Sequence, residues 1–340
     1  MDLNKLLAMM INRKASDLIL SADAPPTFRV DGKLSPLQMA ALGPEECRET
    51  VMQCLGDEDF QTLERVKDVD LSYGVTGLGR FRVNVHMQRG NIACSIRLVA
   101  SSTPLLSDLG LPEVLKELAA KRQGLLLVTG PTGSGKSTTL AAVVNEINKT
   151  RACHIITVED PIEHVFKNDM SIIEQREVGR DTPSFASALR HVLRQNPDVI
   201  MVGEMRDRET IETALTAAET GHLVLSTLHT NDCAQTLDRI VDVFDGHMQA
   251  QIRLQLSMTL AGVLSQQLIE RRGGGRTAAC EFLVNSPAVA NLIRKGETAQ
   301  IKNAIMTGSS IGMISMQKSI STLEAGGVIE RMQPAQTITR

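Results

Sequence analysis

The sequence predicts an α/β protein in which a small α+β domain precedes a larger domain built on a parallel sheet. In residues 80–98, apolar and polar residues alternate on both sides of a turn, as is typical of an antiparallel hairpin. After residue 113, short apolar runs alternate with stretches that favour helix, as in the β–α–β units of a parallel sheet. One such run, Leu125–Thr129, is followed by a glycine-rich loop and by a stretch compatible with helix, Thr138–Asn148.

The composition is that of a globular protein and argues against one class of partner. The 340 residues are 42% hydrophobic and 22% charged, with a net charge of −3, and this length allows two domains. Trp is absent, and the chain has one Tyr and seven Phe. Because nucleic-acid binding draws on a basic surface or on aromatic stacking platforms, we expect no nucleic-acid partner.

The cysteines and the N-terminal segment predict a cytoplasmic protein. The six cysteines form no C-x-x-C pair, so we interpret them as reduced core thiols rather than as zinc ligands or disulfides. Residues 1–10 include an acid and place their apolar side chains on one helical face, which favours a packed helix over an export signal. No apolar run reaches the length of a membrane span, so a role at a membrane requires a partner.

Residues 1–98 form the first predicted domain, and its hairpin carries a candidate functional face. Arg80 and Arg82 lie opposite the apolar face of their strand, and Arg97 joins them across the strand pair. The pattern alone favours a solvated polar face. The alternative is that these arginines reach phosphates bound by an adjacent subunit, as arginine fingers acting in trans.

The second predicted domain spans residues 113–340. Residues 99–112 are rich in serine and proline and are the predicted linker. Within the second domain, the part between about 285 and 330 is predicted to be helical.

The most specific motif is the glycine-rich loop, which matches G-x-x-x-x-G-K-[ST] at every fixed position. Glycines allow backbone N–H groups to turn toward phosphate oxygens, Lys136 supplies a charge at the outer phosphates, and the Ser137 hydroxyl can bind Mg²⁺. The sequence therefore predicts binding of ATP with Mg²⁺. The predicted nucleotide-binding residues are Gly130, Pro131, Thr132, Gly133, Ser134, Gly135, Lys136, Ser137 and Thr138.

Three further apolar runs end in polar residues. The runs at 154–158, 199–203 and 223–228 are followed by the acids Glu159, Asp160 and Glu163, by Glu204, and by His229, respectively. Ligands of an open parallel sheet bind beyond the carboxyl ends of its strands. If these runs are neighbouring strands, their polar ends converge on the phosphate loop.

Several of these side chains have a structural alternative to a role in catalysis. Glu204 can orient or deprotonate water, or it can form an ion pair with Arg206. The acidic cluster after residue 158 suits indirect coordination of Mg²⁺, or it is a solvated turn. His229 can sense the γ-phosphate or reach a neighbouring subunit. His222 begins the same run, near the opposite edge of the sheet, and a core or capping role is favoured for it.

Four segments together resemble the PilT/PilU-type retraction ATPases of type IV pili, within the secretion ATPase superfamily. GPTGSGKSTT at 130–139 resembles the family's phosphate loop, and ITVEDPIEH at 156–164 resembles its Asp box. NPDVIMVGEMRD at 196–207 resembles its atypical Walker B, and TGHLVLSTLHTN at 220–231 resembles its His box. The likeness keeps the family's order and spacing and runs from Met1 to about Ile329.

The resemblance implies a PAS-like N-terminal domain, a RecA-like ATPase domain and a homohexameric ring that drives pilus retraction in twitching motility. It implies a place at the cytoplasmic face of the inner membrane, with a pilus platform protein and a paralogous retraction ATPase as partners. It also implies that Glu204 and Glu163 are the main catalytic acids, and that His222 and His229 lie near the site. The arginines Arg82 and Arg97 are implied to reach a bound nucleotide.

One segment departs from the family pattern. Retraction ATPases usually carry AIRNLIRE, whereas residues 288–295 read AVANLIRK, so Ala290 replaces an arginine and Lys295 replaces a glutamate. A full retraction motor and an accessory paralogue therefore both remain open. The alternatives are a pilus-assembly or type II secretion ATPase, which usually has a tetracysteine zinc insert, and a RecA-like nucleic-acid translocase.

Overall fold

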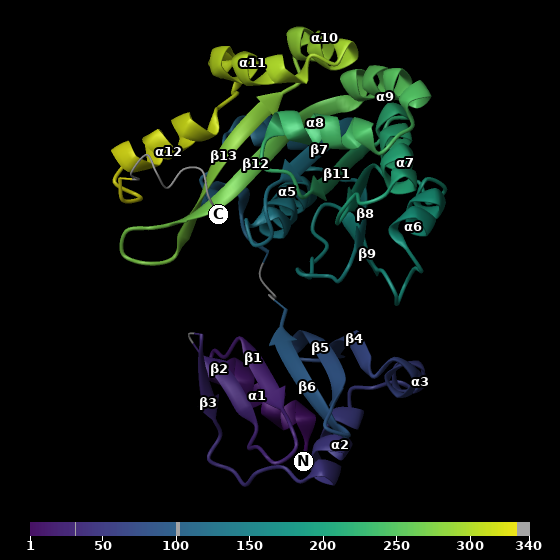
Figure 1. Cartoon of the computed structure of the whole chain (residues 1–340), viewed down its shortest axis with the longest axis vertical. Coiled ribbons are helices and arrows are strands. Elements are labelled where there is room, and N and C mark those ends of the chain that lie inside the picture. Colours follow the sequence, from purple (N-terminus) through teal and green to yellow (C-terminus); the bar gives the residue numbers. More distant parts are fainter. Residues whose placement is uncertain (31, 100–102, 332–340) are drawn as a thin grey trace. The chain divides into compact units, whose positions relative to one another are not determined.

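Figure 1 shows the computed structural model of the protein, which describes residues 1–30, 32–99 and 103–331. The chain divides into two compact units: the first comprises the residues before Thr103 together with Glu163–Val165, and the second comprises the remaining residues from Thr103 onward. Residues 100–102 of the predicted linker lie outside the described residues. Each unit has its own sheet and its own hydrophobic core.

The first unit is an α+β domain whose six-stranded sheet is antiparallel throughout, in the order β3-β2-β1-β6-β5-β4. The strands are β1 (Asp17–Leu20), β2 (Thr27–Val30), β3 (Lys33–Pro36), β4 (Asp68–Val75), β5 (Gly79–Gln88) and β6 (Asn91–Leu98). The helices are α1 (Leu3–Asn12), α2 (Pro44–Met52) and α3 (Asp57–Val66). The predicted N-terminal helix is confirmed, because α1 buries the face formed by Leu3, Leu6, Leu7 and Met10.

The predicted hairpin is confirmed as the pair β5–β6. Phe81, Val83 and Val85 are buried on one face of β5, because successive side chains of a strand point to opposite faces. Arg82 and Arg97 lie directly opposite each other in the register of the two strands, and both are exposed.

Five of the six cysteines are buried, and all six are free, as expected for core thiols. In the first unit, burial raises the pKa of the Cys54 thiol to about 12, because the interior disfavours the charged thiolate. Cys153 is the half-buried exception.

The second unit contains the predicted parallel sheet, in the order β13-β12-β7-β11-β10-β8-β9. Its strands are β7 (Gly124–Thr129), β8 (His154–Glu159), β9 (Ile172–Glu177), β10 (Val199–Val202), β11 (Leu223–Leu228), β12 (Leu260–Glu270) and β13 (Arg276–Val284). All neighbouring pairs are parallel except β12–β13. One strand, β11, therefore separates β7 from β10, and two strands separate β7 from β8.

Helices cover both faces of this sheet. They are α4 (Val114–Ala119), α5 (Lys136–Thr150), α6 (Phe185–Val192), α7 (Arg208–Glu219), α8 (Cys233–Asp242) and α9 (Gly246–Thr259). Alternate residues of β7 enter the two cores: Leu125 and Leu127 pack with α6 to α9, whereas Leu126 and Val128 pack with α4 and α5. Because both faces are covered, β7 and β11 are fully buried and read as continuous apolar runs.

Part of the predicted linker belongs to the second unit. The 3₁₀ helix η1 (Leu106–Leu109) lies within residues 99–112, and Leu106 is buried against α5 and β7 in the core of this unit. The prediction missed this packing because a single apolar turn between prolines carries no periodic signal.

The last part of the second unit is helical, with α10 (Pro287–Lys295), η2 (Thr298–Gln300), α11 (Ile301–Thr307), η3 (Ser309–Ile311) and α12 (Met316–Ala325). Side chains of α10 and α11 join the same core as α6 to α9. Helix α12 lies against β13, where Ile320 packs on Ala279. Across the described ranges, every helix is too short or too polar to cross a membrane.

Candidate nucleotide-binding site

The phosphate loop joins the end of β7 to the start of α5. Gly130, Gly133 and Gly135 have φ angles of 140°, 79° and 89°, which L side chains rarely adopt. Gly135 is the N-cap of α5, so the N–H groups of the first helical turn face the loop. This geometry favours an anion at the helix N-terminus.

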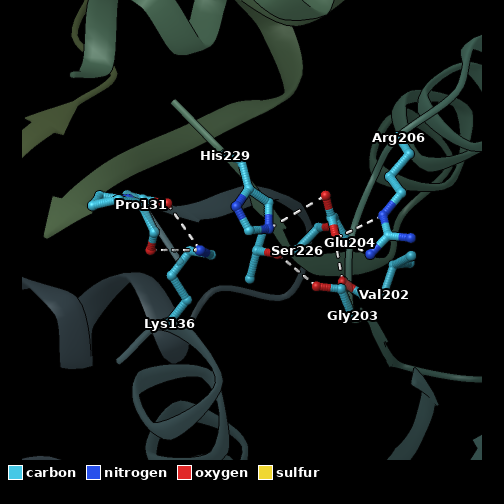
Figure 2. Close-up of polar contacts among 10 residues, drawn as sticks. Pro131, Lys136, Val202, Gly203, Glu204, Arg206, Ser226 and His229 are labelled. Carbon is cyan, nitrogen blue, oxygen red and sulfur yellow. Dashed lines mark hydrogen bonds and ion pairs between the residues drawn. The ribbon is translucent and has the colours of Figure 1, made fainter. Parts of the chain in front are cut away.

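The lysine of the loop lies across the loop itself. Its Nζ atom donates to the carbonyl oxygens of Gly130 and Pro131, at 2.8 and 3.1 Å, and Lys136 is 8% exposed. Figure 2 shows both contacts. The ammonium group is thus held beside the first two residues of the loop. The sequence predicted that this charge binds the outer phosphates.

Glu204 lies at the end of β10 and is bound from two sides (Figure 2). Its Oε2 atom accepts a hydrogen bond from Arg206 Nε at 2.8 Å and lies 2.7 Å from Arg206 Nη2 in an ion pair, and its Oε1 atom lies 3.4 Å from Nε2 of His229. The ion pair with Arg206 is the structural alternative that the sequence left open for this acid. This pairing raises the pKa of Arg206, because the carboxylate accepts its hydrogen bonds and carries the opposite charge.

The backbone around Glu204 is fixed by the neighbouring strand. Ser226 Oγ donates to the Val202 carbonyl at 2.8 Å, and Thr227 Oγ1 donates to the Gly203 carbonyl at 2.6 Å. Because β11 lies between β7 and β10, His229 at its end stands between the phosphate loop and Glu204. The predicted convergence of Lys136, His229 and Glu204 on one edge of the sheet agrees with this order and with Figure 2.

The three acids after β8 have different environments. Glu159 is 6% exposed, and its Oε1 atom accepts from Thr157 Oγ1 at 2.6 Å and from Gln175 Nε2 at 3.0 Å. Asp160 and Glu163 are exposed. Within the described ranges, the Glu163 carboxylate makes neither a hydrogen bond nor an ion pair, so the structure does not connect it to Glu204.

The strand order bears on how the candidate magnesium ligands could act, and it fits the indirect role predicted for the acids after β8. Ser137 is exposed in the first turn of α5, and a hydroxyl oxygen there fits Mg²⁺. The ends of β7 and β8 are three interstrand spacings apart, about 14 Å, so one ion cannot bind directly to both Ser137 and the pair Glu159 and Asp160 of the same chain. Among the described residues, the structure finds no group of three or more His, Cys, Asp or Glu side chains that could hold a metal.

His222 does not join the phosphate loop of its own chain. It precedes Leu223, which pairs with Gly124 at the start of β7, whereas the phosphate loop follows the other end of that strand. Its Nδ1 atom lies 2.9 Å from the carbonyl oxygen of Ala217 near the end of α7. The capping role that the sequence favoured for His222 agrees with this contact, and the position near the site that the resemblance implied does not hold within one chain.

The arginines of the first unit are held by weak ion pairs. Arg97 Nε donates to Asp17 Oδ1 at 2.8 Å, and Arg82 Nη2 lies 3.9 Å from Asp70 Oδ1. The Arg97 and Arg82 side chains are 68% and 48% exposed, so solvent screens both pairs. Both guanidinium groups are therefore free to exchange these partners for a stronger anion.

Sequence reasoning missed two side chains that hold the loop. Gln266 of β12 donates from Nε2 to the Ser134 carbonyl at 2.6 Å, and Thr139 of α5 donates to its Oε1 atom at 2.9 Å. Gln266 is 1% exposed and Thr139 is 2% exposed. The available signal was a glutamine that follows the apolar run 260–264, in a strand that proves to be buried.

The fold and this site define a RecA-like P-loop ATPase with a PAS-like N-terminal domain. A family model described as "Type II/IV secretion system protein" matches residues 80–291, and the chain belongs to this family. The chain is 46% identical over 331 residues to the type IV pilus retraction ATPase PilT of Pseudomonas aeruginosa, covering 97% of this chain and 96% of that one. It is 40% identical to the type IV pilus ATPase PilU of the same organism, covering 97% and 86%.

A solved structure of a retraction ATPase is similar to this chain over nearly its whole length. The crystal structure of the pilus retraction motor PilT with bound ADP aligns with a TM-score of 0.92 and 45% identity, covering 99% of this chain and 98% of that one. The chain is thus an ATPase of the secretion ATPase family, and the predicted fold class is confirmed.

Proposed function

We propose that this protein is an ATP-hydrolysing motor that drives type IV pilus retraction, and thereby twitching motility, as a homohexameric ring. The observation that carries the proposal is similarity to a retraction ATPase over nearly the whole chain. The presence of Lys136, His229 and Glu204 at one edge of the sheet supports it. The motor acts at the cytoplasmic face of the inner membrane, through a platform protein of the pilus.

Lys136 and the N-terminus of α5 bind the phosphates of ATP. In the structure the Lys136 ammonium is bound to two neutral carbonyl oxygens. Phosphate oxygens carry full charge and form stronger hydrogen bonds with an ammonium group, so Lys136 exchanges the carbonyls for the outer phosphates. Ser137 is the residue that would hold Mg²⁺, which supplies neutralisation of the phosphate charge.

Glu204 is the acid that positions and deprotonates the attacking water. Arg206 occupies its Oε2 atom with a short hydrogen bond from Nε and a close ion-pair contact from Nη2. Its Oε1 atom has only the longer contact with His229 among the described residues, so this oxygen is available to water. Glu163 is exposed and is proposed as the second catalytic acid, with Glu159 and Asp160 acting on the metal indirectly.

Three further residues are assigned to contacts between the subunits of the ring. Arg82 and Arg97 are proposed to reach nucleotide across a subunit boundary, where arginine stabilises charge that develops during phosphoryl transfer. His222 lies at the other end of β11, so any contact with nucleotide comes from an adjacent subunit. A paralogous retraction ATPase is the second proposed partner, and no nucleic acid is expected.

Genetic complementation tests the proposal. The wild-type gene, expressed in a strain that lacks its retraction ATPase but keeps the paralogue, is expected to restore pilus retraction and twitching zones. The Lys136→Ala gene is expected to restore neither. Restored pilus assembly in a strain that lacks its extension ATPase would support the assembly alternative, and stimulation of turnover by DNA or RNA would support a translocase.

A further inference from the structure

We propose that Gln266 is a positioning residue for nucleotide binding, because its buried carboxamide sets the conformation of the phosphate loop from the strand side. The inference rests on the proposed function, since it concerns the nucleotide site of the same motor. Gln266 lies on β12, in a part of the chain that none of the four nucleotide motifs includes.

The first step is the hydrogen bonding of Gln266. Its amide nitrogen donates to the Ser134 carbonyl at 2.6 Å, and its amide oxygen accepts from Thr139 Oγ1 at 2.9 Å. One side chain therefore joins the loop to the first turns of α5. The two bonds also fix which way the amide group points, because only this orientation places the donor toward the carbonyl.

The second step is that the loop depends on this bond. A phosphate loop turns its N–H groups inward, so its carbonyl oxygens point outward and need other partners. Lys136 serves Gly130 and Pro131, and Gln266 serves Ser134. The Ser134 hydroxyl is buried, and among the described residues it has no hydrogen-bond partner. Ser134 is thus anchored through its carbonyl and not through its side chain.

The third step is the close packing of the loop on β12. A Cβ atom added at Gly130 would clash with the backbone carbonyl oxygen of Gln266, and one at Gly135 would lie 3.0 Å from Gln266 Nε2. The β12 backbone therefore excludes a side chain at Gly130, and the carboxamide packs tightly on Gly135, in addition to the positive φ angles of both glycines. The strand acts as a fixed surface against which the loop takes its shape.

A matched pair of variants tests the inference. Gln266→Met keeps an unbranched side chain of similar length but removes both hydrogen bonds. Gln267→Met is the control, because Gln267 is the next residue of β12 and is exposed. ADP affinity is measured by calorimetry on the full-length protein. We expect about tenfold weaker ADP binding for Gln266→Met, the effect of losing a buried hydrogen bond, and a change within about twofold for Gln267→Met.

The kinetic constants separate positioning from chemistry. The Gln266 carboxamide bonds to Ser134 and Thr139, so we expect it to act on nucleotide binding rather than on the chemical step: KM for ATP is expected to rise about tenfold while kcat stays within about twofold. Hydrogen exchange of the nucleotide-free proteins is expected to quicken in residues 130–139 of Gln266→Met alone. Unchanged ADP affinity, or a fall in kcat at unchanged KM, would overturn the inference.

A structural role is distinguished by the extent of the change. If Gln266→Met unfolds, or if exchange quickens throughout the second unit, Gln266 supports the core rather than the loop and the inference is wrong. The proposed function fails separately. A wild-type protein that binds and hydrolyses ATP but retracts no pili contradicts the motor and leaves the role of Gln266 standing.

Discussion

Glu204 is the residue at which structural and catalytic interpretations compete most directly. Its ion pair with Arg206 is short, but the Arg206 side chain is 63% exposed. An exposed partner contributes little to stability. The pair is better explained as a device that orients the carboxylate, because it leaves the Oε1 atom facing His229.

The roles of the two acids can be separated by conservative substitution. Glu204→Gln keeps shape and hydrogen bonding but removes the base, so ATP binding is expected to persist while hydrolysis falls at least ~100-fold. Glu163→Gln is expected to lose less activity if this acid acts through the groups around the metal ion rather than on the attacking water. Binding and turnover are measured separately for both variants. Equal loss of ATP binding in the two would contradict this division of roles.

At the residue scale, the sequence could predict which side chains converge when each of them follows a strand of the parallel sheet. Lys136, Glu204 and His229 each follow an apolar run, and parallel strands end at the same edge, so their convergence follows from strand assignment alone. Gln266 could not be predicted in this way. Its partner Ser134 lies 132 residues away, and only the pairing of β12 beside β7 brings the two together.

At the scale of elements, α10 is the clearest test of the departure from the family pattern. The sequence predicts a helix over residues 288–295 with Val289, Leu292 and Ile293 on one face, and the structure confirms it. Ser286 caps the helix by accepting from the Val289 N–H, and Gly296 ends it. Lys295 is exposed and Ala290 is half-buried, so the departure changes charged contacts and leaves the packed face intact.

We therefore expect the departure to affect coupling more than chemistry. The double variant Ala290→Arg, Lys295→Glu is expected to retract pili more strongly than the wild type in a strain with no other retraction ATPase. Its ATP turnover is expected to stay within about twofold, because α10 lies outside the nucleotide motifs. Twitching zones and purified-protein turnover are compared side by side. Full twitching from the unaltered protein alone would show that Ala290 and Lys295 are neutral.

Two features of the fold could not be settled from the pattern of apolar and polar residues: the packing of the linker segment and the position of His222. The sequence assigns residues 99–112 to a linker, and within this segment η1 packs Leu106 into the core of the second unit. A turn of four residues is too short to show helical periodicity, and its burial depends on surfaces supplied by α5 and β7. For His222, the direction of the strand was a better predictor of position than the resemblance to the family. A residue that precedes β11 lies at the other end of the sheet from the phosphate loop.

At the scale of the whole molecule, the proposal requires that sites be completed between subunits. Arg82 and Arg97 occupy facing positions on the β5–β6 hairpin of the first unit. Their ion pairs are exposed and weak. Arginines in this state are suited to bind phosphate supplied by another subunit.

Mixing two inactive variants tests this arrangement. Arg97→Ala subunits keep the phosphate loop, and Lys136→Ala subunits keep the arginine. Mixed rings are expected to recover part of the wild-type turnover, because some interfaces combine an intact loop with an intact Arg97. Formation of mixed rings is checked with two different affinity tags. If tagged mixed rings form and no ratio restores turnover, Arg97 does not act in trans.

The central claim is that the phosphate loop of this chain hydrolyses ATP, and steady-state turnover of Lys136→Ala tests it most directly. The contacts of Lys136 with the Gly130 and Pro131 carbonyls lie within the loop itself, so the variant is expected to keep the wild-type fold by circular dichroism. Its turnover is expected to fall to background, because the charge at the outer phosphates is lost. Turnover near the wild-type rate from a folded Lys136→Ala protein would contradict the account.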